Sequence, residues 1–257
     1  MADPDPITPT PPTPLSSSPS PSPSSPSSIP SPLTGIACAR HAIRKFLPTP
    51  LAPSVIRGVL EDAQAAPSNA NTQPWTVHVV SGATRDRLSA GLLKAHDEGR
   101  FSYDFPYGVA DLSEGIHLAR AHDFAATFYG AVGVARSDRA ARTARTRANL
   151  EFHGAPHAAF LFMPVFGDGV RVAADVGMYA QNFLLSLTSR GLGGIPQAVL
   201  GFHADTVRDI LNVPEELKLL FGISFGEIDR TAPENTFRMG RAPLTQTVTL
   251  HDTPGVL

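Results

Sequence analysis

The first 34 residues differ in composition from everything that follows, and this break limits which part of the chain can fold. They are almost entirely Pro, Ser and Thr, with few apolar side chains. Such a segment buries too little surface to offset the entropy lost on ordering. We therefore expect residues 1–34 to be a disordered tail. We interpret it as a solvated linker or an artefact of the gene start, the alternative being a ligand for a proline-reading domain. Residues 35–257, about 220 residues, are expected to form one domain.

Charge and hydropathy exclude several classes of protein. The formal net charge is −2, so we expect no bulk attraction to nucleic acid or to a membrane surface. No stretch approaches the roughly 18 apolar residues of a membrane-spanning helix. Cys38 is the only cysteine, which excludes a disulfide framework and a thiolate zinc site. No basic residue precedes Arg40 and no apolar signal core is present, so a cytoplasmic protein is expected.

A polar loop between a predicted helix and a predicted strand is the most distinctive feature of the domain. Residues 54–66 are apolar at helical spacing, with Ser54 as the predicted N-cap, and Pro67 ends the helix. The loop, residues 66–75, carries Ser, Asn and Gln side chains, and residues 75–80 predict a strand. Because side chain and backbone can both hydrogen-bond there, this loop suits a planar ligand rich in heteroatoms.

Two basic stretches lie near the two ends of the domain. Residues 40–45 include Arg40, His41 and Arg44, and residues 235–244 include Arg238 and Arg241. Clustered arginines suit a phosphate or a polarised carbonyl. For the first stretch the alternative is a solvated basic face on a first helix. The opposite, apolar face of that helix would carry Ile36, Ala39, Ile43 and Phe46.

The remaining elements follow from the period of the apolar residues. Helices are predicted at 84–99, 111–130, 137–150, 171–190 and 205–212, and strands at 157–166, 193–199 and 219–228. Ser137 and Asp205 are predicted N-caps, and Gly191 ends the long helix. Small residues beside large ones on that helix allow a second helix to approach closely. The order of elements predicts an α+β fold with a mixed or antiparallel sheet surrounded by helices.

Motifs that carry chemistry by themselves are absent. The chain has no glycine-rich dinucleotide fingerprint, no phosphate-binding P-loop and no nucleophile elbow. Its histidines and acidic residues show no metal-ligand spacing, so no metal site is predicted. A polar pocket without acid–base machinery fits a bound cofactor that carries the chemistry. The aromatic stretch 101–108 is either a mobile cover over a pocket or a loop tucked onto the core.

Five segments, in order along the chain, resemble the nitroreductase family of flavin enzymes. They are residues 40–46, 66–75, 194–197, 225–229 and 238–244. The resemblance covers roughly residues 36–250. It implies a nitroreductase-like α+β fold with a mostly antiparallel central sheet flanked by helices, in a homodimer of the domain-swapped type. It also implies one FMN in each of two clefts at the interface of the dimer.

The resemblance assigns roles to individual positions. Arg40 and Arg241 are expected on the FMN phosphate, and Arg44 near flavin N1 and O2, where negative charge gathers on reduction. The backbone at 196–198 is expected beside N5, and Asn69, Asn71 and Gln73 are expected to contact the flavin from the partner chain. The full set of predicted cofactor-binding residues is Arg40, His41, Ala42, Arg44, Ser68, Asn69, Asn71, Gln73, Asn149, Pro196, Gln197, Ala198, Arg238 and Arg241. Ala42 replaces a serine found in many members, and Met239 replaces a cation found in some.

The activity implied by the resemblance is ping-pong hydride transfer. NADH or NADPH reduces the flavin and leaves, and an electron-poor small molecule such as a nitroaromatic or a quinone takes its place. The flavin carries the chemistry, so no catalytic side chain is predicted, and the acceptor pocket is expected to be shaped by Phe101, Tyr103, Phe105 and Tyr107. Two alternatives stay open: other flavin chemistry on the same scaffold (dehalogenation, ene reduction or azoline oxidation), or a non-enzymatic flavin-binding protein whose tail recruits partners.

Overall fold

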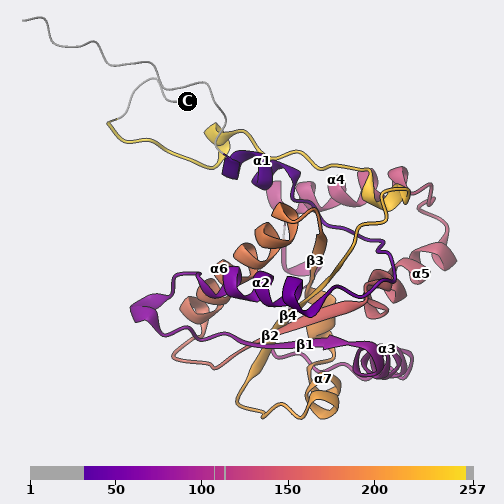
Figure 1. The fold of residues 1–257 in the computed structure, drawn as a ribbon. Coiled ribbons are helices and arrows are strands. Elements are labelled where there is room, and N and C mark those ends of the chain that lie inside the picture. The colour runs from indigo at the N-terminus through magenta and orange to yellow at the C-terminus, as the bar shows by residue number, and fades with distance from the viewer. Residues whose placement is uncertain (1–31, 107, 113, 253–257) are drawn as a thin grey trace, which may run out of the picture. The chain divides into compact units, whose positions relative to one another are not determined.

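The computed structural model describes residues 32–252 except 107 and 113. Within this part of the chain, a central sheet has the strand order β1-β2-β4-β3, and every neighbouring pair is antiparallel (Figure 1). Its strands are β1 (Thr76–Ser81), β2 (His157–Met163), β3 (Gly193–Gln197) and β4 (Lys218–Gly226). The predicted strands are confirmed, and of the two sheet types expected the sheet is antiparallel.

Seven helices pack around the sheet in the described residues. They are α1 (Pro32–Ala39), α2 (Pro53–Gln64), α3 (Gly82–Asp97), α4 (Ile116–Ala131), α5 (Arg139–Leu150), α6 (Val170–Ser189) and α7 (Ala204–Leu211). The predicted tail, residues 1–34, lies outside the described residues except at its end, where residues 32–34 open α1.

The predicted N-caps are wrong although the helices are present. Ser54 lies inside α2, which begins at Pro53, because the fixed φ of proline suits the first helical position. Asp138 caps α5 in place of Ser137, and Asp205 lies in the first turn of α7, where its carboxylate binds an arginine instead. Several neighbouring polar residues can serve as the N-cap, so the apolar pattern that predicts a helix does not determine which residue caps it.

Gly191 ends α6 as predicted. Its φ of +72° is left-handed, the conformation that favours glycine after a helix. The N–H of Leu192 donates to the carbonyl of Leu187 (2.9 Å) and that of Gly191 to Thr188 (3.0 Å). This is the double bond pattern of a Schellman motif, and it turns the chain from α6 directly into β3.

Both faces of the sheet are covered, because alternate residues of β2 enter two different cores. Leu161 and Met163 pack in the core shared with α2 and α6, whereas Phe160 and Phe162 pack in the core shared with α3 and α7. Figure 1 shows α2 and α6 on one side of the sheet and α3 and α7 on the other. All seven residues of β2 are buried, as expected for a central strand.

Residues 40–47 run extended along the outer side of β3. Ala42 pairs with Gly194, and Phe46 pairs with Ile228, so the alternative of a helix through residues 40–46 is wrong. A Cβ on Gly193 would lie 2.5 Å from Ile43 Cγ1, and this glycine therefore lets the segment pack against β3. Helix α1 stops at Ala39, and the basic stretch that follows is fixed at the sheet edge.

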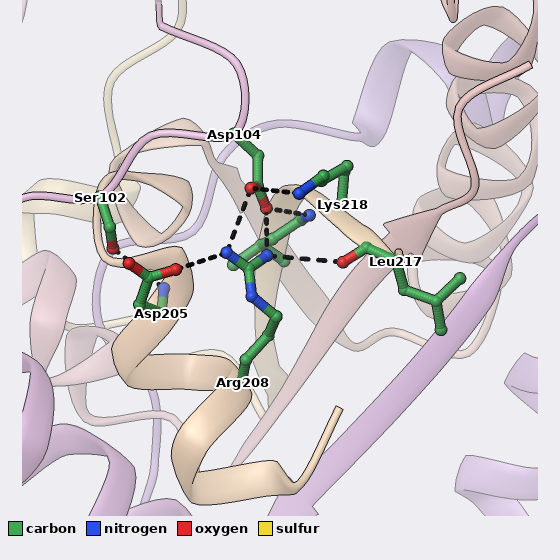
Figure 2. A network of polar contacts seen from close by, with 7 residues as sticks. Ser102, Asp104, Asp205, Arg208, Leu217 and Lys218 are labelled. Atoms are coloured by element: carbon green, nitrogen blue, oxygen red, sulfur yellow. Dashed lines mark hydrogen bonds and ion pairs between the residues drawn. The ribbon is translucent and has the colours of Figure 1, made fainter. Parts of the chain in front are cut away.

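Residues 101–105 are tucked onto the domain, which decides between the two alternatives for that part of the aromatic stretch. Ser102 accepts a hydrogen bond from the N–H of Ala204 (3.0 Å). Asp104, buried beneath it, accepts hydrogen bonds from Arg208 Nη1 (2.5 Å) and from the N–H of Leu219 (2.7 Å). Figure 2 shows Asp104 between Arg208 of α7 and Lys218 of β4, so the segment is joined to both elements.

Candidate functional site

Two adjoining cavities lie at the edge of β3, with volumes of about 630 and 490 Å³. The first, here the arginine cavity, is lined by residues 37–44 and 237–241. The second, here the α4–α5 cavity, is lined by α4, α5 and residues 195–199. The two cavities share the side chains of Arg44, Phe124, Ile195 and Pro196. They therefore form one depression whose ends differ in chemistry.

Arg44 stands where the two cavities meet. Its guanidinium carbon lies 4.9 Å from the ring centre of Phe128, 5.4 Å from Phe237 and 5.5 Å from Phe124. Asn235 fixes its backbone, because the side-chain oxygen of Asn235 accepts from the Arg44 N–H at 2.7 Å. Burial lowers the pKa of Arg44 to about 10, so the side chain is still cationic at neutral pH. Aromatic faces stabilise such a cation but leave its charge unneutralised.

No carboxylate lies within 4.0 Å of Arg44 in the part of the chain that the structure describes. Three further arginines line the arginine cavity, and none of them forms an ion pair with another described residue. Arg238 donates to the carbonyl of Asn235 (2.9 Å), and Arg241 to that of Gly240 (3.0 Å). Burial and then the charge of Arg241 lower the pKa of Arg40. An anion placed beside these neighbouring cations would stabilise their charges.

His41 adds an unsatisfied nitrogen to the same wall. Its Nδ1–H donates to the carbonyl of Ala39 (2.8 Å), while its buried Nε2 has no hydrogen-bond partner among the described residues. Burial and the charges of Arg238 and Arg40 lower its pKa, although two backbone carbonyls oppose the shift. The ring is neutral, and its free nitrogen is a hydrogen-bond acceptor.

A chain of buried polar side chains forms the inner wall of the α4–α5 cavity. The hydroxyl of Ser224 donates to Gln197, and Gln197 Nε2 donates to the Asn149 side-chain oxygen (3.2 Å). His153 Nε2 donates to the same oxygen at 3.2 Å. Burial, then the charges of Arg44 and Arg145, lower the pKa of His153 to about 3. The wall is therefore rigid and uncharged, and the amide of Asn149 is held by its neighbours.

The polar loop of residues 68–73 is held in a strained conformation elsewhere on the chain. Ala70, Asn71 and Gln73 have φ values of 49°, 57° and 46°, which non-glycine residues adopt at a cost. The N–H of Gln73 donates to Ser68 Oγ (2.9 Å), and that of Asn69 to Asp175 Oδ2 (3.1 Å). The loop lines neither cavity of its own chain.

The structure brings together most of the predicted site residues, but not all of them. The arginine and α4–α5 cavities are lined by Arg40, His41, Ala42, Arg44, Asn149, Pro196, Gln197, Ala198, Arg238 and Arg241. The aromatic candidates lie elsewhere. Phe101 stacks on His203 (5.1 Å between ring centres), Tyr103 packs on Phe202, and Phe105 contacts the core beside α2 and α6. Tyr107 lies outside the described residues. Their role at an acceptor pocket stays a prediction.

The residues that contact Arg44 were not predicted from the sequence. Phe124 and Phe128 are four residues apart on α4, so they lie on one face of the helix and stack with 5.9 Å between ring centres. This spacing of two aromatic residues is the feature of the sequence from which the aromatic surface beside Arg44 could have been predicted. Asn235 and Phe237 lie within the basic C-terminal stretch, where only the arginines were singled out. No pattern in the sequence indicates that this stretch packs against α4.

Two other kinds of site find no support in the described residues. A groove of about 1000 Å³ runs along α2, but the ring of its His157 is already bonded to Ser81 and to the N–H of Leu51 (2.8 Å). No group of three or more His, Cys, Asp or Glu in these ranges is placed to hold a metal ion. None of the helices described is long and apolar enough to cross a membrane.

Comparison with known proteins identifies the family to which this chain belongs. A family model described as "Nitroreductase family" matches residues 37–227. The chain is 47% identical over 208 residues to nitroreductase NfnB of Mycolicibacterium smegmatis, covering 81% of this chain and 88% of that protein. It is 31% identical to a 4-nitrobenzoate reductase of Pseudomonas putida, covering 80% and 89%. The chain belongs to the nitroreductase family.

Solved structures agree with this assignment. The crystal structure of the FMN-dependent nitroreductase NfnB from Mycobacterium smegmatis in complex with NADPH superposes with a TM-score of 0.80 at 44% identity, covering 84% of this chain and 96% of that chain. An FMN and NADPH-dependent nitroreductase NfnB from Sphigopyxis sp. strain HMH gives a TM-score of 0.81 at 27% identity, covering 86% and 99%. The predicted family and fold are confirmed.

Proposed function

We propose that this protein is an FMN-dependent oxidoreductase that uses NAD(P)H to reduce nitroaromatic compounds. The observation that carries the proposal is the charge of Arg44. A guanidinium buried among three aromatic rings, with no carboxylate within 4.0 Å in the described residues, fits an anionic, planar ligand. The activities named for the related proteins point to the same chemistry.

The residues present fit FMN. Its phosphate would lie among Arg40, Arg238 and Arg241, whose charges repel one another without an anion between them. Its ring system would extend towards Arg44 and the apolar surfaces of Ile195 and Pro196, which both cavities share. When bound, FMN supplies hydride acceptance from NAD(P)H and electron delivery to the nitro group.

The side chains of the site bind and orient, and they set the local charge. Arg44 holds a fixed positive charge that stabilises negative charge developing beside it, and the bond from Asn235 prevents the backbone from shifting as that charge develops. The inner wall of Asn149, His153 and Gln197 contributes hydrogen-bonding groups without a titrating charge near neutral pH.

We further propose that two copies of the chain complete each site. The loop of residues 68–73 lines neither cavity of its own chain, and three of its residues hold a left-handed φ that costs free energy. In a homodimer, the loop of one copy would cover the cavity of the other. A cytoplasmic location, where NAD(P)H is available, is part of this proposal.

An absorbance spectrum of the purified protein tests the proposal. We expect the visible bands of bound oxidised flavin, and we expect NADPH added without air to bleach them and 4-nitrobenzoate to restore them. Protein that takes up no FMN would refute the cofactor assignment. Yellow protein that NADPH and NADH both fail to bleach would refute the enzymatic activity.

Arg241→Ala tests the phosphate assignment separately. Arg241 is exposed, so its loss removes one charge from the cavity without opening the core. We expect the dissociation constant of FMN to rise about tenfold at low salt and less at high salt, because salt screens exposed charges. An unchanged affinity would place the phosphate elsewhere.

A further inference from the structure

The α4–α5 cavity has a cation on its wall that the proposed binding of FMN does not use. Three arginines line this cavity: Arg44, Arg142 and Arg145. Arg44 is assigned above to the cofactor. Arg145 forms an ion pair with Glu234, and its hydrogen bond helps to hold the pKa of Glu234 below its usual range despite burial. Arg142 remains, without a carboxylate within 4.0 Å in the described part of the chain.

Arg142 is held at the cavity by contacts that leave its charge available. Its guanidinium carbon lies 5.4 Å from the ring centre of Tyr129, so α5 supplies the cation and α4 supplies the aromatic face. Its Nη1 donates to the carbonyl of Arg136 at 3.4 Å, a long hydrogen bond. A guanidinium has five N–H donors, so most of those of Arg142 are left for a ligand.

The other arginines of α5 differ from Arg142 in position or in pairing. Arg147 forms an ion pair with Asp97, and Arg139 lies one turn before Arg142 without lining the cavity. The candidate anion site is therefore Arg142 itself and not the basic surface of α5 as a whole. At this cavity, one unneutralised cation lies beyond the shared boundary at Arg44, on the side away from the arginine cavity.

We propose that Arg142 is a specificity residue that binds an anionic substituent of the molecules reduced or oxidised in this cavity. The inference rests on the proposed function, in which NAD(P)H and the acceptor occupy the same space in turn. The shared chemistry is an oxyanion that a planar guanidinium can bind with two parallel hydrogen bonds. It has two possible sources: a carboxylate on the aromatic acceptor, or the 2′-phosphate that distinguishes NADPH from NADH.

Substrate pairs that differ only in this anion test the proposal. We compare 4-nitrobenzoate with the neutral 4-nitrobenzamide, and NADPH with NADH, in the FMN-loaded protein, in Arg142→Gln and in the matched control Arg139→Gln. If the carboxylate is the source, the ratio of kcat/KM for 4-nitrobenzoate over 4-nitrobenzamide falls about tenfold in Arg142→Gln. If the 2′-phosphate is the source, the ratio for NADPH over NADH falls by a similar factor.

The control Arg139→Gln is expected to change neither ratio by more than about twofold, since its charge lies on the same helix but not on the cavity wall. A binding measurement accompanies the kinetics: calorimetric dissociation constants for benzoate against benzamide and for NADP⁺ against NAD⁺. A shift confined to the charged member of one pair in Arg142→Gln supports the proposal and identifies the source.

Three outcomes would overturn the proposal. The first is that both ratios stay unchanged in Arg142→Gln because charged and neutral ligands weaken equally. The second is that Arg139→Gln changes the ratios as much as Arg142→Gln, which would indicate only the general electrostatic field of the helix. The third is that calorimetry finds no preference for the anions. Failure of the proposed function looks different, because then the wild-type protein reduces neither nitro compound, while the calorimetric comparison still reports on Arg142.

Discussion

Arg208 is buried and Arg44 is half-buried, and the two arginines differ in how their charges are compensated. Arg208 lies between two carboxylates, donating to Asp104 at 2.5 Å and to Asp205 at 2.6 Å (Figure 2). Arg44 lies among aromatic rings at the cavity boundary, and no carboxylate in the described residues is within 4.0 Å of it. One cation is neutralised within the fold, whereas the other is left in need of an anion.

The pKa shifts of the two arginines have opposite signs for this reason. Burial lowers the pKa of Arg208, but its hydrogen bonds to Asp104 and Asp205 raise it above the ordinary value. Burial alone lowers the pKa of Arg44 to about 10. An unneutralised buried charge costs stability unless a ligand compensates it, so we read Arg208 as structural and Arg44 as functional.

The first test of this comparison removes the structural cation. In Arg208→Met the buried carboxylate of Asp104 keeps only the Leu219 N–H and Lys218, 3.7 Å away, as partners. We expect the free energy of unfolding of the flavin-free protein, from urea denaturation, to fall by about 3 kcal/mol. The dissociation constant of FMN should change less than about twofold. A large loss of FMN affinity would contradict a purely structural role for Arg208.

The double variant Asp104→Leu/Arg208→Met is the matched control for this prediction. It removes both buried charges, and replacing a buried ion pair by apolar groups is often close to neutral. We expect more than half of the lost stability to return. A double variant as unstable as Arg208→Met would show that the loss came from packing and not from the unpaired carboxylate.

The second test removes the functional cation. In Arg44→Met we expect the dissociation constant of FMN to rise about 100-fold, or about 2.8 kcal/mol at 1.4 kcal/mol per factor of ten. The flavin-free protein should be no less stable to urea than wild type, because no ion pair is broken. Lys45→Met is the matched control, since Lys45 is an adjacent, exposed cation that lines neither cavity. Equal losses in the two variants would contradict a specific role for Arg44.

The contrast between these two arginines also shows what could be predicted from the sequence. Arg44 was found because it lies in a short basic motif next to Arg40, a local pattern that resembles a family. The surroundings of Arg44 were not found, because Phe128 and Phe237 come from segments about 100 residues apart in the chain and meet only in three dimensions. The ion pair between Asp104 and Arg208 was not predicted either, because these residues also lie far apart in the chain.

Elements with strong apolar periodicity were predicted well, whereas the conformation of short segments was not. The helix at 171–190 was identified by its repeating apolar face, and Val176 and Phe183 on that face are buried. Residues 40–46 have apolar side chains at a spacing that also suits a helix, but pairing with β3 keeps them extended. Tertiary contacts override the helical preference of so short a segment, because only a few residues contribute to that preference.

The third prediction concerns His153, whose pKa of about 3 results from burial and from the charges of Arg44 and Arg145. Between pH 6.5 and 3 the unfolded chain binds a proton at this histidine that the native protein does not. The free energy of unfolding therefore falls by up to about 1.4 kcal/mol for each unit that the pH drops through this range. His153→Asn lacks this contribution, and asparagine tolerates the left-handed φ of 53° at this position.

Urea denaturation of the flavin-free protein at intervals between pH 6 and 4 measures this slope. We expect it to be shallower in His153→Asn than in wild type, while His41, His78, His157 and His203, whose pKa values are also lowered, contribute equally to both. Equal slopes would mean that native His153 binds its proton as readily as the unfolded chain does. In the Arg44→Met background the difference should shrink, because one of the two positive charges that keep His153 neutral is gone. A smaller difference in that background would show that the charge of Arg44 acts on the titration of His153.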